Sequence, residues 1–155
     1  MKKYIFIAAM ALSLLALASC EKYEDGRPSK AVRNEFKSMY PDARDIEWEA
    51  EAGYWAVSFE TGKAPDVKER TAWYDAAGNW IRTKTEIPVS ALPQEIKNYI
   101  SGSSYAGATI ADVDADYYET PSGNFYRLDI IYDGVKMEID VSEDGKVTVA
   151  DVGVL

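Results

Sequence analysis

The sequence predicts an α+β protein built from two tandem copies of one unit, each a helix followed by an antiparallel meander of strands. Apolar residues recur with helical spacing in two places, residues 32–40 and 92–100. After each of these segments, apolar and polar residues alternate in short runs, which is the period of a half-buried strand. Short turns containing Gly and Asp connect the runs, and short connections favour antiparallel pairing.

The chain begins with a segment that has the features of a secretion signal. Two lysines near the start precede an apolar run that reaches Ala18 and is interrupted only by Ser13. This run is shorter than the roughly 20 residues of a membrane-spanning helix. It closes on Leu17-Ala18-Ser19-Cys20, which resembles the lipobox of bacterial lipoproteins. We therefore predict that residues 1–19 are a signal peptide removed before Cys20, with an ordinary signal peptide as the alternative.

The lipobox resemblance implies that the Cys20 thiol is acylated. Cys20 is the only cysteine of the chain, so no intramolecular disulfide can form, and its place at the signal boundary fits lipidation better than redox chemistry. Two or three acyl chains hold a protein on a membrane far more firmly than one. We expect a cell-envelope protein attached only through this anchor, on the outer membrane, facing the periplasm or the cell surface. The polar residues 20–28 are expected to be a tether.

The charge of the predicted mature chain restricts its partners. Removing residues 1–19 leaves 136 of the 155 residues, with all 26 acidic side chains and 15 of the 17 basic ones, a formal charge of −11. Nucleic acids and anionic lipids bind clustered Lys and Arg, so neither is an expected partner. An acidic surface favours a basic partner, although solubility alone also explains acidity.

The first predicted unit covers residues 29–87. Ser29 is a suitable N-cap for a helix whose apolar face includes Val32 and Phe36, and Pro41 ends it. Alternating segments then predict strands at residues 46–49, 54–59, 72–74 and 80–81. The turn at residues 75–78 has Asp at its start, which can bond the backbone ahead, and Gly at its end, which tolerates positive φ.

The second predicted unit, residues 88–155, repeats this order. Leu92, Ile96 and Ile100 form the apolar face of a second helix, and Gly102 is a natural terminator. Alternating strands follow, and the turn at residues 142–145 again ends on a glycine. Because one helix per unit covers one face of a sheet, the other face should remain free.

Several motifs resemble one protein family. The stretch Ala72-Trp-Tyr-Asp-Ala-Ala-Gly-Asn-Trp80, followed by Glu86-Ile87 and Leu92-Pro93, is similar to the PepSY-like, β-lactamase-inhibitor-protein-like family of secreted and lipid-anchored Bacteroidetes proteins. The family more often has Phe where Tyr74 stands. The resemblance covers residues 29–155 and implies tandem α/β units that share one curved antiparallel sheet. It also suggests inhibition of a partner enzyme, but no inhibitory residue can be matched to a position of this chain.

Enzymatic chemistry has little support in the composition. The chain has no histidine, which excludes His-containing triads and most zinc sites, and no Gly-rich phosphate loop. We predict no catalysis, no cofactor and no metal. A carboxylate-dependent hydrolase is a further alternative. Asp112, Asp114 and Asp116 resemble the start of a calcium loop, but Tyr117 and Gly123 occupy the positions that need Gly and Glu, so a solvent-facing strand is expected instead.

Aromatic residues provide the candidate binding site. The chain has four Trp and eleven Tyr, and several aromatics are adjacent within predicted strands. Adjacent strand residues point to opposite faces, so one of each pair should lie on the free face even if the other fills the core. The candidate binding face comprises Trp48, Tyr54, Trp55, Trp73, Tyr74, Trp80 and Tyr126.

These observations favour a non-catalytic domain that binds an unidentified protein, as an inhibitor or modulator of a secreted or periplasmic enzyme. A carbohydrate or small-ligand binder is the alternative, because exposed Trp and Tyr rings also stack on sugars.

Overall fold

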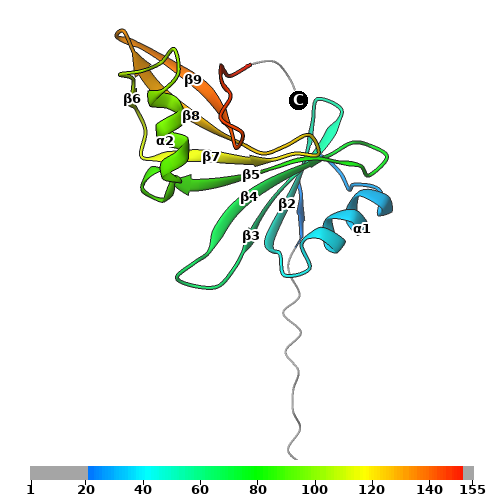
Figure 1. Ribbon diagram of the computed structural model, residues 1–155. Helices are drawn as coiled ribbons and strands as arrows, with labels where there is room; N and C mark the ends of the chain where they lie inside the picture. The colour runs from blue at the N-terminus through cyan, green and yellow to red at the C-terminus, as the bar shows by residue number, and fades with distance from the viewer. Residues whose placement is uncertain (1–20, 152–155) are drawn as a thin grey trace, which may run out of the picture.

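The computed structural model describes residues 21–151, which form one curved, mostly antiparallel sheet of ten strands with two helices (Figure 1). The predicted signal peptide and the predicted acylation site Cys20 lie outside the described residues, as do residues 152–155. The elements are β1 (Lys22–Tyr23), α1 (Lys30–Met39), β2 (Arg44–Glu51), β3 (Tyr54–Thr61), β4 (Lys68–Tyr74), β5 (Trp80–Pro88), a 3-10 turn (Val89–Ala91), α2 (Gln94–Ser101), β6 (Thr109–Ile110), β7 (Asp114–Glu119), β8 (Phe125–Tyr132), β9 (Val135–Ser142) and β10 (Val147–Val149).

The strands follow each other in chain order across the sheet. The order is β1-β2-β3-β4-β5-β7-β8-β9-β10, and the short β6 pairs with β8. All pairings are antiparallel except that of β1 with β2. The predicted α+β class and the curved antiparallel sheet are therefore confirmed. β1 lies inside the segment expected to be a tether, because Tyr23 packs against the core and holds this part of the chain on the sheet edge.

Each helix begins and ends close to where its sequence signals indicate. The Ser29 hydroxyl accepts a hydrogen bond from the Val32 amide at 3.3 Å, which caps α1. Val32 and Phe36 are the buried residues of α1, and Ile96 and Ile100 are those of α2. Both helices therefore bury the apolar stripe that predicted them.

The helices cover two separate hydrophobic cores. The first core joins α1 to β2–β5 and contains Val32, Phe36, Ile46, Trp48, Val57, Phe59, Ala72 and Tyr74. The second core joins α2 to β7–β9 and contains Leu92, Ile96, Ile100, Ala115, Leu128, Ile130, Ile139 and Val141. Each half thus has a helix followed by strands, as expected. That the two halves are copies of one unit stays a prediction.

Both cores lie on the same face of the sheet. Within β5, Thr83 is opposite Ala72 of the first core, and Ile87 is opposite Ala115 of the second. Residues four apart in a strand point to the same face, so α1 and α2 cover one face and leave the other free. The β5–β7 ladder, which runs from Thr83–Glu119 to Pro88–Asp114, joins the halves into a continuous sheet.

The turn between β4 and β5 touches the helix above it. The Asp75 carboxylate accepts hydrogen bonds from the amides of Ala77 and Asn79 at 2.9 and 2.8 Å, as the turn signature predicts. Gly78 has φ of +99°, and a Cβ at this position would stand 3.1–3.2 Å from Ala31 and the Val32 amide of α1. Glycine is thus needed here both for the backbone conformation and for the close approach of the helix.

Replacing Gly78 with alanine should lower the free energy of unfolding by about 1–3 kcal/mol, because the positive φ is strained and the new methyl presses on α1. Chemical denaturation of the purified domain measures this. Gly53→Ala is the matched control, since Gly53 has φ of +89° but open space around its Cβ position. Equal losses in the two variants would show that the contact with α1 contributes nothing.

Candidate binding face

The side chains on the helix-free side of the sheet form what we call the free face. Strand alternation places them there because each occupies the parity opposite to the core residues of its strand. They include Glu47, Glu49 and Glu51 of β2, Tyr54, Ser58 and Glu60 of β3, Glu69, Thr71 and Trp73 of β4, Arg82, Lys84 and Glu86 of β5, Asp116 and Tyr118 of β7, Phe125, Arg127 and Asp129 of β8, and Lys136, Glu138 and Asp140 of β9.

Carboxylates oppose each other directly across three strand pairs of the free face. The pairs are Glu60–Glu69, Glu86–Asp116 and Asp129–Glu138. Like charges directly opposite each other destabilise a sheet, so these pairs oppose folding.

In each carboxylate pair, only one member makes an ion pair. Glu60 lies 3.8 Å from Arg44, Asp116 lies 3.6 Å from Lys84, and Asp129 lies 3.0 Å from Lys136. The other members make no ion pair with any residue of the 21–151 range, and all are solvent-exposed: Glu69, Glu86 and Glu138. The free face therefore presents three carboxylates available to an external cation.

Two shallow hollows on this face gather the acidic side chains. One, of about 310 Å³, has Glu60, Glu69 and Glu86 in its lining. The other, of about 340 Å³, has Glu86, Asp116 and Glu138 in its lining. Glu86 belongs to both, so the two hollows adjoin and form one acidic surface across the middle of the sheet.

An aromatic and guanidinium row crosses the same face. The Arg82 guanidinium lies over the Trp73 ring at 4.5 Å and the Tyr118 ring at 5.2 Å, and Arg127 lies over Tyr118 at 5.3 Å. The rings of Tyr118 and Phe125 are stacked with centroids 4.9 Å apart. These contacts are of the cation–π and offset-stacked kinds, and they tie β4, β5, β7 and β8 together on the side that has no helix.

Burial and hydrogen bonding shift the ionisation of this row. The bidentate hydrogen bonds from Arg127 to Asp140, at 2.8 and 2.9 Å, raise the pKa of the Arg127 guanidinium. Burial lowers the pKa of the Arg82 guanidinium and raises the pKa of the Tyr118 phenol. At the other end, the Trp73 indole donates to Glu51 at 2.8 Å.

The predicted aromatic residues do not share one face. Tyr54 and Trp73 lie on the free face. Trp48 and Tyr74 are fully buried in the first core, so the expectation that they belong to an exposed binding face is wrong; α1 covers both rings. The remaining three lie half-buried on the helix side, packed against the first core or the second: Trp55, Trp80 and Tyr126.

The main residues of the face were not among those predicted. Arg82, Tyr118, Phe125 and Arg127 come together only through strand register. The adjacent pairs Tyr117–Tyr118 and Phe125–Tyr126 were a usable signal, because one ring of each pair had to leave the core. The carboxylate pairs left no such signal, since their members come from different strands.

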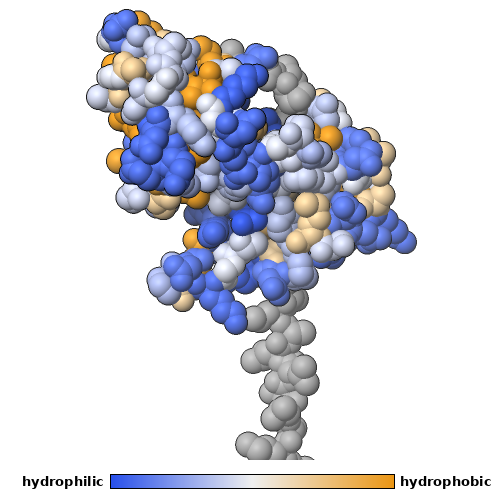
Figure 2. Space-filling view, in the orientation of Figure 1, coloured by the Kyte–Doolittle hydropathy of each residue, from blue (hydrophilic) through white to orange (hydrophobic). Residues whose placement is uncertain are grey.

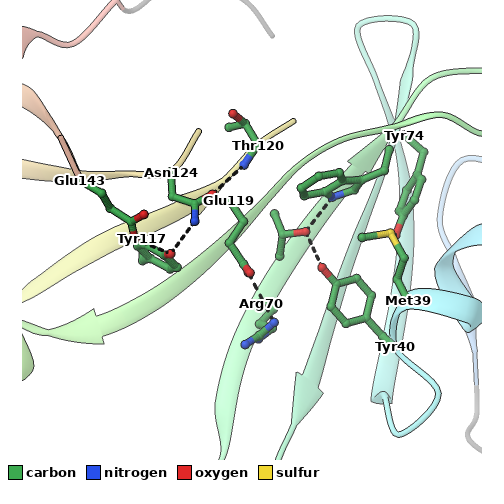
Figure 3. A network of polar contacts seen from close by, with 11 residues as sticks. Met39, Tyr40, Arg70, Tyr74, Tyr117, Glu119, Thr120, Asn124 and Glu143 are labelled. Atoms are coloured by element: carbon green, nitrogen blue, oxygen red, sulfur yellow. Dashed lines mark hydrogen bonds and ion pairs between the residues drawn. The ribbon is translucent and has the colours of Figure 1, made fainter. Parts of the chain in front are cut away.

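A separate polar network occupies the helix side between the two cores (Figure 3). Tyr40 and Thr83 hydroxyls lie 2.6 Å apart, and the Trp80 indole donates to Thr83 at 2.9 Å. Arg70 pairs with Glu119 at 3.6 Å. These contacts fill the interval that neither helix covers and link β4, β5 and β7 to the end of α1.

The visible surface in the orientation of Figure 1 is largely hydrophilic, and its strongest hydrophobic colour gathers near α2 and β9 (Figure 2). No group of three or more potential ligands among residues 21–151 is arranged to hold a metal ion. Neither helix in this range is long and apolar enough to cross a membrane.

A curved sheet with both helices on one side and a charged, ring-lined face on the other defines a small α+β domain. The family model described as "Putative beta-lactamase-inhibitor-like, PepSY-like" matches residues 53–148. This chain belongs to that family.

Solved structures from Bacteroides species share the fold. A BLIP-like protein from Bacteroides fragilis is 27% identical, with a TM-score of 0.68 over 82% of this chain and 88% of that one. A DUF2874 family protein from Bacteroides ovatus is 21% identical, with a TM-score of 0.65 over 80% and 89%. A "putative periplasmic" protein from Bacteroides eggerthii is 17% identical, with a TM-score of 0.63 over 79% and 86%. No curated protein sequence matches the chain.

Proposed function

We propose that this protein is an envelope lipoprotein whose free face binds a protein with a cationic surface, as an inhibitor or modulator of a secreted or periplasmic enzyme. The observation that carries the proposal is the set of three opposed carboxylate pairs, each with one exposed member that has no ion pair. Such pairs weaken the isolated domain, and a partner that supplies Lys or Arg side chains would relieve the repulsion.

The surroundings of the carboxylates also fit a macromolecular partner. The two acidic hollows are shallow and adjoining, so they offer a broad surface and no enclosed ligand cavity. A carboxylate-dependent hydrolase would need a pair in a cleft that orients a substrate, whereas these pairs lie on an open sheet. Stacking on sugars needs exposed rings, but Trp73 is 7% and Tyr118 is 6% exposed.

The attachment to the membrane is a further part of the proposal. Acylation of Cys20 would place the domain at the outer membrane, and the described chain begins on the sheet edge at β1. Mass spectrometry of the protein purified from its native envelope tests this: a diacyl- or triacyl-modified N-terminal Cys20 is expected, and an unmodified cysteine would contradict it.

The triple variant Glu69→Gln, Glu86→Gln, Glu138→Gln should weaken partner binding about tenfold, because each exposed ion pair contributes up to about 1 kcal/mol. The same variant should unfold at higher denaturant concentration, since removing each like-charge pair stabilises the sheet by a few tenths of a kcal/mol or more. The partner is captured from an envelope extract by the immobilised domain, identified, purified, and measured by calorimetry against each variant.

The matched control is Glu35→Gln, Asp42→Asn, Glu95→Gln, which removes the same charge from exposed positions away from the free face. This control should bind like the wild type. If both triple variants bind equally well, or if both lose affinity to the same extent, the free face does not carry recognition. Loss of binding together with increased stability in the first variant excludes misfolding as the cause.

A further inference from the structure

A third hollow, apolar in character, lies at the end of the sheet. It has a volume of about 440 Å³ and forms where β5 begins and the turn between β7 and β8 passes beside it. Trp80, Ile81, Pro121 and Phe125 form its apolar lining, together with residues of the turn. Its volume falls in the range of small-ligand sites, and such sites are mostly apolar with a few placed polar groups.

One charged side chain borders this hollow, and within residues 21–151 it has neither an ion-pair nor a hydrogen-bond partner. Arg82 lines the hollow, yet its guanidinium makes no ion pair and donates no hydrogen bond to any residue within the described range 21–151. Its Nε is buried and unsatisfied. An unpaired buried donor costs more free energy than an average hydrogen bond contributes. A ligand that brings a hydrogen-bond acceptor to Arg82 would therefore be stabilised.

Arg127 is a comparable arginine whose guanidinium does have a carboxylate partner. It lies on the same face, also stacks on Tyr118, and holds Asp140 with two hydrogen bonds. A planar guanidinium matches a carboxylate through two parallel N–H groups. Arg82 has the same stacking but no internal carboxylate, although the chain has 26 acidic residues.

Stacking also prepares Arg82 for binding. The guanidinium lies between Trp73 at 4.5 Å and Tyr118 at 5.2 Å, so its plane is held before any ligand arrives. A preorganised group loses little conformational freedom on binding, which increases affinity. The Glu51 carboxylate, which is close enough to influence Arg82, is already bonded to the Trp73 indole.

We propose that this hollow binds an apolar group that carries one carboxylate. The apolar part packs against Ile81, Pro121 and Phe125, and the carboxylate accepts two hydrogen bonds from Arg82. A doubly charged phosphate fits less well, because one cation beside an apolar lining in an acidic protein cannot balance it. The site uses none of the three exposed carboxylates of the proposed function, so each proposal can fail without the other.

The test is an NMR titration of the soluble domain, residues 21–155, with N-acetyl-L-phenylalanine, and in parallel with its uncharged amide. Amide signals of residues 80–82 and 120–125 should shift with the carboxylate probe, with a dissociation constant of about 1 mM, which corresponds to about −4 kcal/mol. The uncharged probe should bind at least tenfold more weakly, because a charge-assisted hydrogen bond is lost.

Two variants distinguish binding in this hollow from nonspecific attraction between the charged probe and the protein. Arg82→Gln should weaken the carboxylate probe at least tenfold and bring it level with the amide probe. Lys84→Gln removes the same charge two residues along the same face but outside the hollow, and should leave binding within twofold. Equal affinity for both probes, shifts centred elsewhere, no shifts at all, or an equal loss in both variants would each overturn the proposal. The spectrum of each free variant verifies its fold.

Discussion

Replacing Phe36 with alanine is expected to lower the free energy of unfolding by about 3–5 kcal/mol, the usual cost of deleting a buried aromatic ring. Phe36 is 1% exposed and lies at the centre of an aromatic cluster under α1. Its ring centroid is 5.0 Å from that of Phe59 and 5.3 Å from that of Trp48, both in edge-to-face arrangement. The substitution would leave a cavity bounded by rigid rings, which cannot collapse to fill it.

Urea denaturation followed by tryptophan fluorescence measures this loss, because Trp48 belongs to the same cluster. Glu35→Ala on the exposed side of α1 is the control, and it should change the free energy of unfolding by less than about 0.5 kcal/mol. A Phe36→Ala loss below about 1 kcal/mol would mean that α1 is not held to the sheet by this cluster.

Replacing Leu128 with alanine is expected to cost about 2–5 kcal/mol and to destabilise both halves of the protein together. Leu128 is 1% exposed in the second core, whereas all four tryptophans lie between residues 48 and 80. Tryptophan fluorescence therefore reports only on the first half. Because the β5–β7 ladder makes the sheet continuous, we expect the fluorescence transition to move to lower urea along with the far-UV circular dichroism transition.

A circular dichroism transition that splits, with fluorescence unchanged, would show that the two cores unfold independently and that the ladder couples them weakly. The control is Ile131→Ala on the same strand, since Ile131 is 43% exposed and points away from the core. This variant should leave both transitions close to their wild-type positions.

Much of the architecture could be predicted because it rests on local periodicity. The apolar spacing around Phe36 and Ile96 predicted both helices, and the Asp75–Gly78 turn predicted the connection between β4 and β5. The short strands β1 and β6 were not expected. Two residues show no period, and such strands form only because a longer neighbour offers free hydrogen-bonding groups.

The candidate site was harder to predict because it depends on register. The alternation of side chains along a strand predicts that Trp73 and Tyr74 point to opposite faces, but it does not predict which of them enters the core. That choice follows from the neighbours: Tyr74 stands opposite Trp55 and Trp80, on the side where α1 packs. The carboxylate pairs depend on register in the same way, since Glu86 and Asp116 are opposite each other although α2 and β6 lie between them in the sequence.

The separation of the two faces has a consequence for how this protein can diversify. The side chains of the two cores and the side chains of the free face alternate along the same strands and point to opposite sides of the sheet. Exchanging Glu69, Thr71 or Lys84 would change the exposed surface, while Ala72 beneath α1 and Thr83 in the polar network beside it keep their packing. Related chains can therefore change the partner they recognise while the hydrophobic core stays the same. A combinatorial library restricted to these outward positions would sample new binding specificities on an unchanged scaffold.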